Sequence, residues 1–168
     1  MNIIVFTKRV PATQEEELRI TGEGKAVDLS KVPFKVNDWD NYSVEEAVRI
    51  VEKSGGAVTA VSIGDAESDE VLRRAIAMGA KDGFLVESGD IVHDPNARAT
   101  LIQNFLKKEN VPFEAIFTGV QSEDDQFASV GGILAAKMGL PFVSMVIGID
   151  AFEKDHAIVR RELEGGLQ

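Results

Sequence analysis

The sequence contains no cysteine, only two histidines and one tryptophan among its 168 residues. Without cysteine the chain has no disulfide, no thiolate metal ligand and no cysteine nucleophile. No apolar run approaches the roughly 20 residues of a membrane-spanning helix. The apolar residues 3–6 are followed by Lys8 and Arg9, whereas a signal peptide carries its basic residues first. We therefore predict a cytoplasmic protein without membrane insertion.

Basic residues are also scarce, with 18 lysines and arginines against 28 acidic residues, a net charge of -10. A surface of this sign repels phosphates, so nucleic acid is not an expected partner. The hydrophobic fraction of 44% is that of a folded protein. A chain of this length suits one domain with its own core, and we expect residues 1–168 to form a single domain.

Short apolar runs alternate with longer amphipathic ones along most of the chain. Strands are predicted at residues 3–7, 57–63, 83–86, 115–118, 143–149 and 157–160, and helices at 43–53, 65–78, 96–108 and 127–138. Such alternation is typical of an α/β fold, an open and mostly parallel sheet with helices on both faces. The irregular segment 11–39 is expected to be functional, disordered or a hairpin excursion.

Local signals predict where two of these helices begin. Ser43 and Glu46 form a capping box, and Asp94 before Pro95 indicates an N-cap followed by proline at the first helical position. On the helix that begins near Ser43, the apolar spacing predicts that Ala47, Val48 and Val51 face inward. Glu45 and Arg49 are then expected on its exposed side.

Ligands of an open parallel sheet bind beyond the carboxyl ends of its strands, where residues 7–11, 63–65 and 119–132 lie. The last loop leads into a helix whose early turns contain Ser129, Gly131 and Gly132, small residues that let a phosphate approach free amides. Close packing explains the two glycines equally well. Asp124 and Asp125, taken alone, indicate helix capping rather than catalytic acids.

Other candidate residues favour structural roles. Trp39 is typical of a core side chain, and His93 and His156 of solvated loops. There is no G-x-G-x-x-G after the first strand and no G-x-x-x-x-G-K-[ST] anywhere, so neither common nucleotide fingerprint applies. No catalytic residue or metal site is predicted. The residues themselves indicate an α/β domain with a small-molecule site.

Five motifs in order resemble those of electron transfer flavoprotein beta subunits, over nearly the whole chain. They are Lys8-Arg9-Val10-Pro11, the stretch from Asn37-Asp38-Trp39-Asp40 to Arg49, the run from Leu72 to Ala80, the loop from Gly119 to Asp125, and the segment from Arg160 to Gly166. After Ala80 this chain has Lys81, at a position where an aspartate is usual in that family.

The resemblance implies a fold of the adenine nucleotide alpha hydrolase type, Rossmann-like, and a defined function. An alpha subunit would be the partner, with FAD shared in the heterodimer. The pair would carry electrons between dehydrogenases, such as acyl-CoA dehydrogenases, and the respiratory chain. The chain would then be an electron carrier subunit and not an enzyme by itself. Its family's C-terminal recognition loop and arm are expected to be absent from these 168 residues.

Beta subunits bind a nucleotide of their own, a structural AMP in many and a second FAD in electron-bifurcating members. The resemblance assigns this nucleotide to Phe6, Asn37, Asp38, Trp39, Asp40, Ile63, Gly119, Gln121, Ser122, Asp124, Gln126, Ser129 and Val130. Asp125 and Phe127 replace a glycine and a threonine of the bifurcating pattern, which favours AMP. Val130 stands where many AMP-binding members have threonine.

Two further hypotheses belong to other classes. A stand-alone adenine-nucleotide module of the universal-stress type shares the fold class, but its glycine-rich phosphate loop is not found here. A hydrolase or dehydrogenase would need a nucleophile beside a base, or a dinucleotide fingerprint, and the sequence shows neither. Co-expression with an alpha subunit would separate the first hypothesis from the electron-transfer one.

Overall fold

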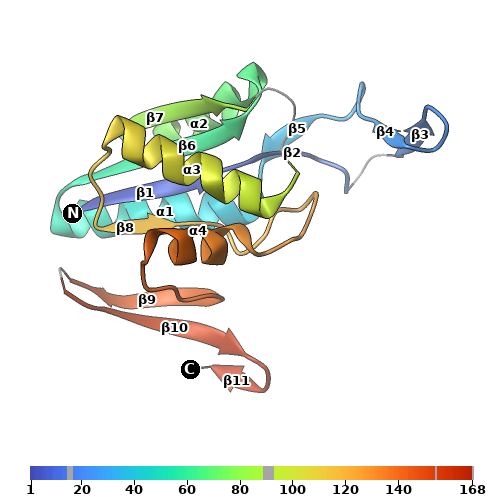
Figure 1. Ribbon diagram of the computed structural model, residues 1–168. Coiled ribbons are helices and arrows are strands. Elements are labelled where there is room, and N and C mark those ends of the chain that lie inside the picture. Colours follow the sequence, from blue (N-terminus) through green and yellow to red (C-terminus); the bar gives the residue numbers. More distant parts are fainter. Residues whose placement is uncertain (15–16, 89–92, 154, 168) are drawn as a thin grey trace.

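The computed structural model describes residues 1–14, 17–88, 93–153 and 155–167. Four parallel strands form its central sheet in the order β7-β6-β1-β8 (Figure 1). They are β1 (Asn2–Thr7), β6 (Ala57–Gly64), β7 (Asp82–Glu87) and β8 (Ala115–Phe117). β1 is central because it pairs with β6 along its whole length and with β8 from Ile3 to Val5. The predicted parallel sheet is confirmed.

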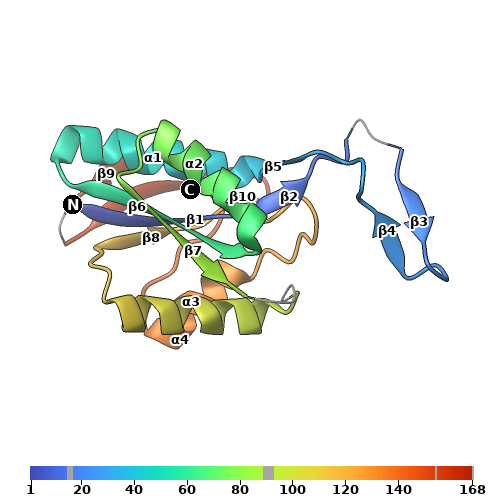
Figure 2. The same cartoon turned by 90° about the horizontal axis from the view of Figure 1, so that it is seen from above.

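Helices cover both faces of this sheet, as predicted (Figure 2). They are α1 (Asp38–Ser54), α2 (Asp69–Ala77), α3 (Pro95–Glu109) and α4 (Val130–Met138), with a 3-10 turn at Ala66–Ser68. α1 and α2 close a core cluster around Ile3 and Val5, and α3 and α4 close one around Ile4 and Val61. Alternate residues of β1 therefore serve opposite cores. No described helix could span a membrane.

The strand order reverses at β1. The chain proceeds from β1 to β6 and β7 on one side and then returns to place β8 on the other side of β1. After β1 it leads to α1 on one face, and after β8 to α4 on the opposite face. The loops that follow β1 and β8 therefore lead to opposite faces of the sheet, and the place between such loops, called the crevice below, is where open α/β sheets bind ligands.

Helix α1 begins five residues before the predicted capping box, which is therefore wrong as a start signal. Asn37 is the N-cap, because its carbonyl accepts bonds from the amides of Asp40 and Asn41. Ser43 lies inside the helix and donates to the carbonyl of Trp39 instead. The predicted orientation is confirmed: Glu45 and Arg49 are exposed, Ala47 is buried, and Val48 and Val51 pack against the core.

Helix α3 starts as predicted, with Asp94 accepting a bond from Ala97 and Pro95 in the first turn. Helix α4 begins three residues later than expected. Gln126 and Ala128 have left-handed φ angles of 53° and 51°, which no continuous helix contains. Gly139 then ends α4 in a left-handed conformation.

The described residues of the segment 11–39 that precede α1 form a hairpin excursion, one of the three outcomes expected for the segment. β2 (Arg9–Pro11) pairs with β5 (Phe34–Val36), and β3 (Arg19–Thr21) pairs with β4 (Ala26–Asp28). All these pairs are antiparallel. The β3–β4 end extends well away from the main body (Figure 2).

The C-terminal strands form a separate antiparallel sheet, β9 (Val146–Phe152), β10 (Ala157–Leu163) and β11 (Gly166–Leu167). The prediction that residues 143–149 continue the parallel series is wrong. Arg161 bonds the carbonyl of Ser144, and Met145 takes a left-handed φ of 57°. The chain is thereby turned before β9, which pairs with β10 instead. Phe152 packs against Phe117 and fastens the hairpin to the core.

Candidate functional site

The predicted nucleotide residues gather where the strand order reverses, at the carboxyl ends of β1 and β8. Three segments meet there: Lys8 after β1, the start of α1, and the loop of residues 119–127 after β8. Hydrogen bonds join all three. The chain brings together residues more than 110 positions apart in sequence.

Asp40 is the buried anchor of this arrangement, with only 6% of its surface exposed. Its carboxylate accepts a bond of 2.8 Å from the amide of Lys8 and another from the amide of Gly119. It thus connects the ends of β1 and β8 through the first turn of α1. A Cβ on Gly119 would overlap Asp40 Oδ1 and lie 3.0 Å from Trp39 Cβ, so only glycine allows this approach.

Asn37 connects the same helix end to the loop after β8. Its side-chain amide donates to the carbonyl of Gln121 at 2.9 Å, and its Oδ1 accepts from the amide of Glu123 at 3.2 Å. Glu123 also accepts from the amide of Asp38 and pairs with Lys35 at 3.0 Å. Asn37 is only 1% exposed, so it is a structural link and its polar atoms face the loop.

Lys8 lies at the centre of the loop. Its ammonium contacts Asp124 at 2.6 Å, Asp125 at 2.8 Å and Ser122 Oγ at 3.0 Å. Arg98 on α3 approaches Asp125 at 3.8 Å. The prediction that Asp124 and Asp125 cap the helix α4 is therefore wrong. They bind cations instead, because the loop folds back over β1.

The electrostatics of the site follow from burial and these bonds. Burial raises the pKa of Asp40 to about 7, although the amides of Lys8 and Gly119 favour its charged form. Burial also acts to raise the pKa of Asp124 and of Asp125, but bonds from Lys8 and Ser122 outweigh it. Both pKa values consequently lie below the ordinary value. The site thus combines one carboxyl that titrates near neutrality with two that stay charged.

A second group of predicted residues is apolar and packs into the core at this end of the sheet. Phe6, Ile63 and Val130 all pack against the core cluster between the sheet and α3 and α4. They come from β1, β6 and α4, at the same end of the sheet as the polar network. An apolar surface beside a polar loop is the usual lining of a small-molecule site.

Other predicted residues lie at the surface. Trp39 is 42% exposed and contacts the Tyr42 ring edge-on, so the prediction of a core side chain is wrong. Gln126 is exposed. His93 and His156 are both exposed, as predicted.

The start of α4 presents free backbone donors. Ser129 is its N-cap, but the Ser129 side chain makes no capping bond within the described part of the chain. The amides of Val130, Gly131 and Gly132 belong to the first turn, where no intrahelical acceptor exists. Packing is tight at Gly131, where a Cβ would lie 2.7 Å from Thr118 Oγ1, and less so at Gly132, where a Cβ would lie 3.3 Å from the half-exposed Phe142 ring.

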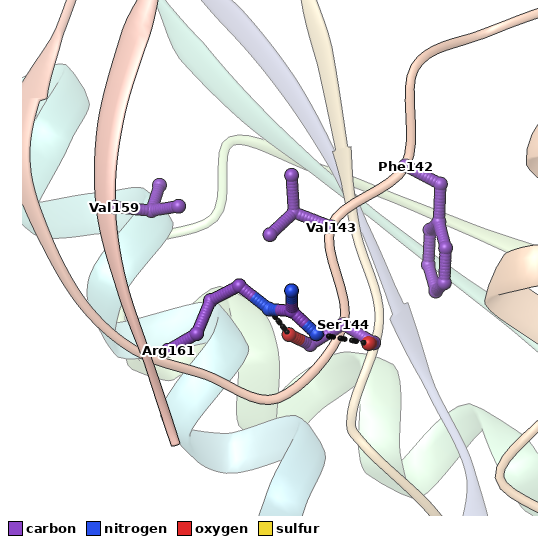
Figure 3. A pocket seen from close by; sticks show the side chains of 5 residues that line it. All are labelled: Phe142, Val143, Ser144, Val159 and Arg161. Atoms are coloured by element: carbon purple, nitrogen blue, oxygen red, sulfur yellow. Dashed lines mark hydrogen bonds between the residues drawn. The ribbon is translucent and has the colours of Figure 1, made fainter. Parts of the chain in front are cut away.

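A cavity of about 350 Å³ lies elsewhere, between the turn before β9 and the strand β10 (Figure 3). Its lining is Phe142, Val143, Ser144, Val159 and Arg161. The Arg161 guanidinium donates to the carbonyl and to Oγ of Ser144. None of these five residues was predicted for the nucleotide, so this cavity is distinct from the crevice.

Sequence reasoning placed Lys8 and Glu123 within candidate ligand-binding segments but named neither as a site residue. Lys8 belongs to the Lys8-Arg9-Val10-Pro11 motif directly after the first strand, and that position was the available signal. Nothing local indicated its partners, since the two aspartates lie 116 and 117 residues away.

The sequence profile of a family described as "Electron transfer flavoprotein domain" matches residues 25–168. An electron transfer flavoprotein subunit beta of Thermoanaerobacterium thermosaccharolyticum is 36% identical over 169 residues, which is 100% of this chain and 63% of the relative. One of Methylophilus methylotrophus is 34% identical, over 99% of this chain and 64% of the relative. A protein FixA of Azotobacter vinelandii is 30% identical, over 100% and 61%. The chain spans less than two thirds of the length of these relatives.

Proposed function

Because this chain belongs to the electron transfer flavoprotein family, we propose that it serves as a beta subunit which carries electrons together with an alpha subunit. The names of its relatives support this assignment, since they are called subunit beta. In the heterodimer the two subunits share FAD, which accepts and releases the electrons. Dehydrogenases, such as acyl-CoA dehydrogenases, are the donors and the respiratory chain the acceptor. The chain has no catalysis of its own in this proposal, and its location is cytoplasmic.

The crevice between β1 and β8 is proposed to hold a structural AMP. The observation that carries this is the position of the loop 119–132: it starts at a strand's carboxyl end where the strand order reverses and ends at a helix N-terminus. Amides of the first turn of α4 and the Ser129 hydroxyl are donors for the phosphate. Phe6 and Ile63 supply the apolar surface for the base, near Asn37.

The residues of the loop favour AMP over a second FAD. Asp125 contacts the Lys8 ammonium and accepts from the amide of Phe127. Its carboxylate places a negative charge in this loop, and the pyrophosphate of FAD would add further negative charge beside it. A ligand with one phosphate needs fewer anion contacts than FAD, and α4 offers a single helix end. AMP therefore suits this loop better.

Denaturing the purified protein and identifying any released nucleotide by mass and absorbance is the direct test. AMP is the expected product. Release of FAD from the chain alone would favour the bifurcating type instead. Co-expression with an alpha subunit separates both from a stand-alone module of the universal-stress type, which would not form a stable complex.

A charge placed at the helix end tests the phosphate position. Ser129→Asp brings a carboxylate to the start of α4 and should abolish AMP binding in a calorimetric titration while the fold is retained. Ser30→Asp adds the same charge at an exposed position of the hairpin excursion and should leave the affinity unchanged. Equal affinity of wild type and Ser129→Asp would remove this loop from the site.

A further inference from the structure

We propose that Lys8 is a positioning residue for the loop 119–132. Its ammonium organises the turn of residues 122–127 so that the chain beyond it enters α4 with its amides toward the crevice. The effect on nucleotide affinity rests on the function proposed above, whereas the effect on the loop itself does not.

The ammonium uses all its donors within this turn. A lysine ammonium has three N–H groups, and Lys8 has three acceptors, on Ser122, Asp124 and Asp125. All are within 3.0 Å, and the Lys8 side chain is only 17% exposed. These are charge-assisted bonds in a partly desolvated place, so they are stronger than an ion pair at the surface. No donor is left to bind a phosphate directly.

The acceptors are in turn linked to one another. Ser122 Oγ donates to Asp125 Oδ1 at 2.7 Å, and the same Oδ1 accepts from the amide of Phe127 at 3.2 Å. Asp124 Oδ1 accepts from the amide of Asp125 at 2.9 Å. Without a cation, two adjacent carboxylates would repel each other in this turn. The Lys8 charge, together with that of Arg98 at 3.8 Å from Asp125, offsets this repulsion.

The turn leads directly into the strained part of the loop. Gln126 and Ala128 both have left-handed φ angles, which cost energy in residues other than glycine. Such a backbone persists only where neighbouring contacts hold it. The bonds around Lys8 are the contacts at its N-terminal side, and Ser129 follows at the start of α4.

Lys8 is itself held firmly by the sheet and by α1. Its amide donates to Asp40 at 2.8 Å, and its carbonyl accepts from the amide of Asn37 at 2.9 Å. The ammonium thus has a rigid base from which to hold the loop. Arg9, next in sequence, points elsewhere, to Glu67 and Glu70.

The alternative role is a direct contact of Lys8 with phosphate, and the two roles differ in the loop without nucleotide. If Lys8 positions the loop, Asp125→Asn weakens the turn and speeds amide exchange across residues 119–132 in the absence of AMP. If Lys8 only binds phosphate, the same change leaves that exchange as in wild type. Ser122→Ala removes one neutral acceptor and is the mildest variant, useful if the others fold poorly.

Amide hydrogen exchange of the full chain is measured first, without nucleotide. Lys8→Met should speed exchange across residues 119–132 by roughly tenfold or more, as expected for the loss of charge-assisted bonds. Lys8→Arg should restore most of the protection. The control Lys31→Met changes an exposed lysine and should leave exchange as in wild type. AMP affinity, by calorimetry, should fall in Lys8→Met, and exchange of the loop without nucleotide should also rise in Asp125→Asn.

The outcomes separate this inference from the function proposed above. If wild type binds no AMP but Lys8→Met still loosens the loop, the nucleotide proposal fails and the positioning role stands. If wild type binds AMP and Lys8→Met alters neither exchange nor affinity, the positioning role is overturned and the nucleotide proposal stands. Exchange of the loop in Asp125→Asn that equals that of wild type also overturns it.

Discussion

Side chains at the crevice end of the central sheet are bonded and buried, whereas several side chains of the β9–β10 hairpin and the segment before it are exposed to water. At the crevice, Lys8, Asn37 and Asp40 bond to the loop after β8, and each is largely withdrawn from water. On the hairpin, Ile147 and Ile158 are 51% and 54% exposed. Phe142, on the segment before β9, is 52% exposed.

This difference in exposure suggests separate roles for the two regions, nucleotide binding at the crevice and association with a partner at the hairpin. The hydrogen bonds that join Lys8, Asn37 and Asp40 to the loop after β8 all lie within this chain, so we expect the proposed nucleotide binding not to need a partner. On the hairpin, Phe152 packs against the core, but Ile147 and Ile158 stay about half exposed in the described part of this chain. Exposed apolar residues of this kind mark protein interfaces. We therefore expect mutations at the crevice to change folding and binding together, and mutations on the hairpin to change association alone.

Two glycine substitutions give the largest expected contrast. Gly119→Ala places a methyl group on Asp40 Oδ1, next to the backbone of α1, and should lower the free energy of unfolding by about 2–4 kcal/mol. Gly148→Ala on β9 meets only the end of the Arg160 side chain, at 2.6 Å. That side chain is half exposed and moves aside, so we expect a change within about 0.5 kcal/mol.

Urea denaturation measures both variants. Neither glycine has a left-handed φ, so the contrast reports the neighbouring atoms alone. Equal losses of stability in the two variants would show that the crevice is no more tightly packed than the hairpin.

The pH dependence of stability tests Asp40, with a smaller effect. A carboxyl whose pKa is about 7 in the folded state and about 4 in the unfolded state binds its proton more tightly when folded. Its contribution to stability is present at low pH and is lost as pH rises through 7. Between pH 5 and 7 the free energy of unfolding of wild type, relative to Asp40→Asn, should fall by roughly 2 kcal/mol.

The variant carries no titrating carboxyl at this position, so the other acids cancel in the difference. Asp124 and Asp125 have lowered pKa values, and their effect appears only at more acidic pH. A difference that is flat between pH 5 and 7, or that rises, would mean that Asp40 stays charged in the folded protein.

The hairpin gives the smallest expected effect on stability. Replacing Ile147 and Ile158 with serine should change the free energy of unfolding of the isolated chain by less than about 0.5 kcal/mol per site, because both side chains are already half in water. The same double variant should retain less alpha subunit in a co-purification. Undiminished retention would assign the interface to another surface.

Local signals predicted what local contacts decide. Asp94 caps α3 through Ala97, three residues away, and the sequence predicts it correctly. Ser43 failed as a helix start because Asn37, six residues earlier, is held by the carbonyl of Lys8. The alternation of strands and helices gave the sheet, but not the turn before β9, where Arg161 holds Ser144 from 17 residues away.

The site shows the same limit. Gly119, Asn37 and Asp40 were predicted through the family resemblance. In the structure, hydrogen bonds of Asn37 and Asp40 hold the start of α1 to the loop that begins at Gly119. Lys8 was not named as a site residue because a lysine after a strand is ordinary. Only the fold reveals that Asp124 and Asp125 are its partners.

Chemical-shift mapping of AMP on the isotope-labelled chain tests the central claim most directly. Binding at the crevice predicts that the shifted amides are those of Lys8, Asn37 and the loop 119–132, while the amides of Val143, Ser144 and Val159 stay in place. Shifts confined to those last residues, which line the cavity beside β10, would contradict the account.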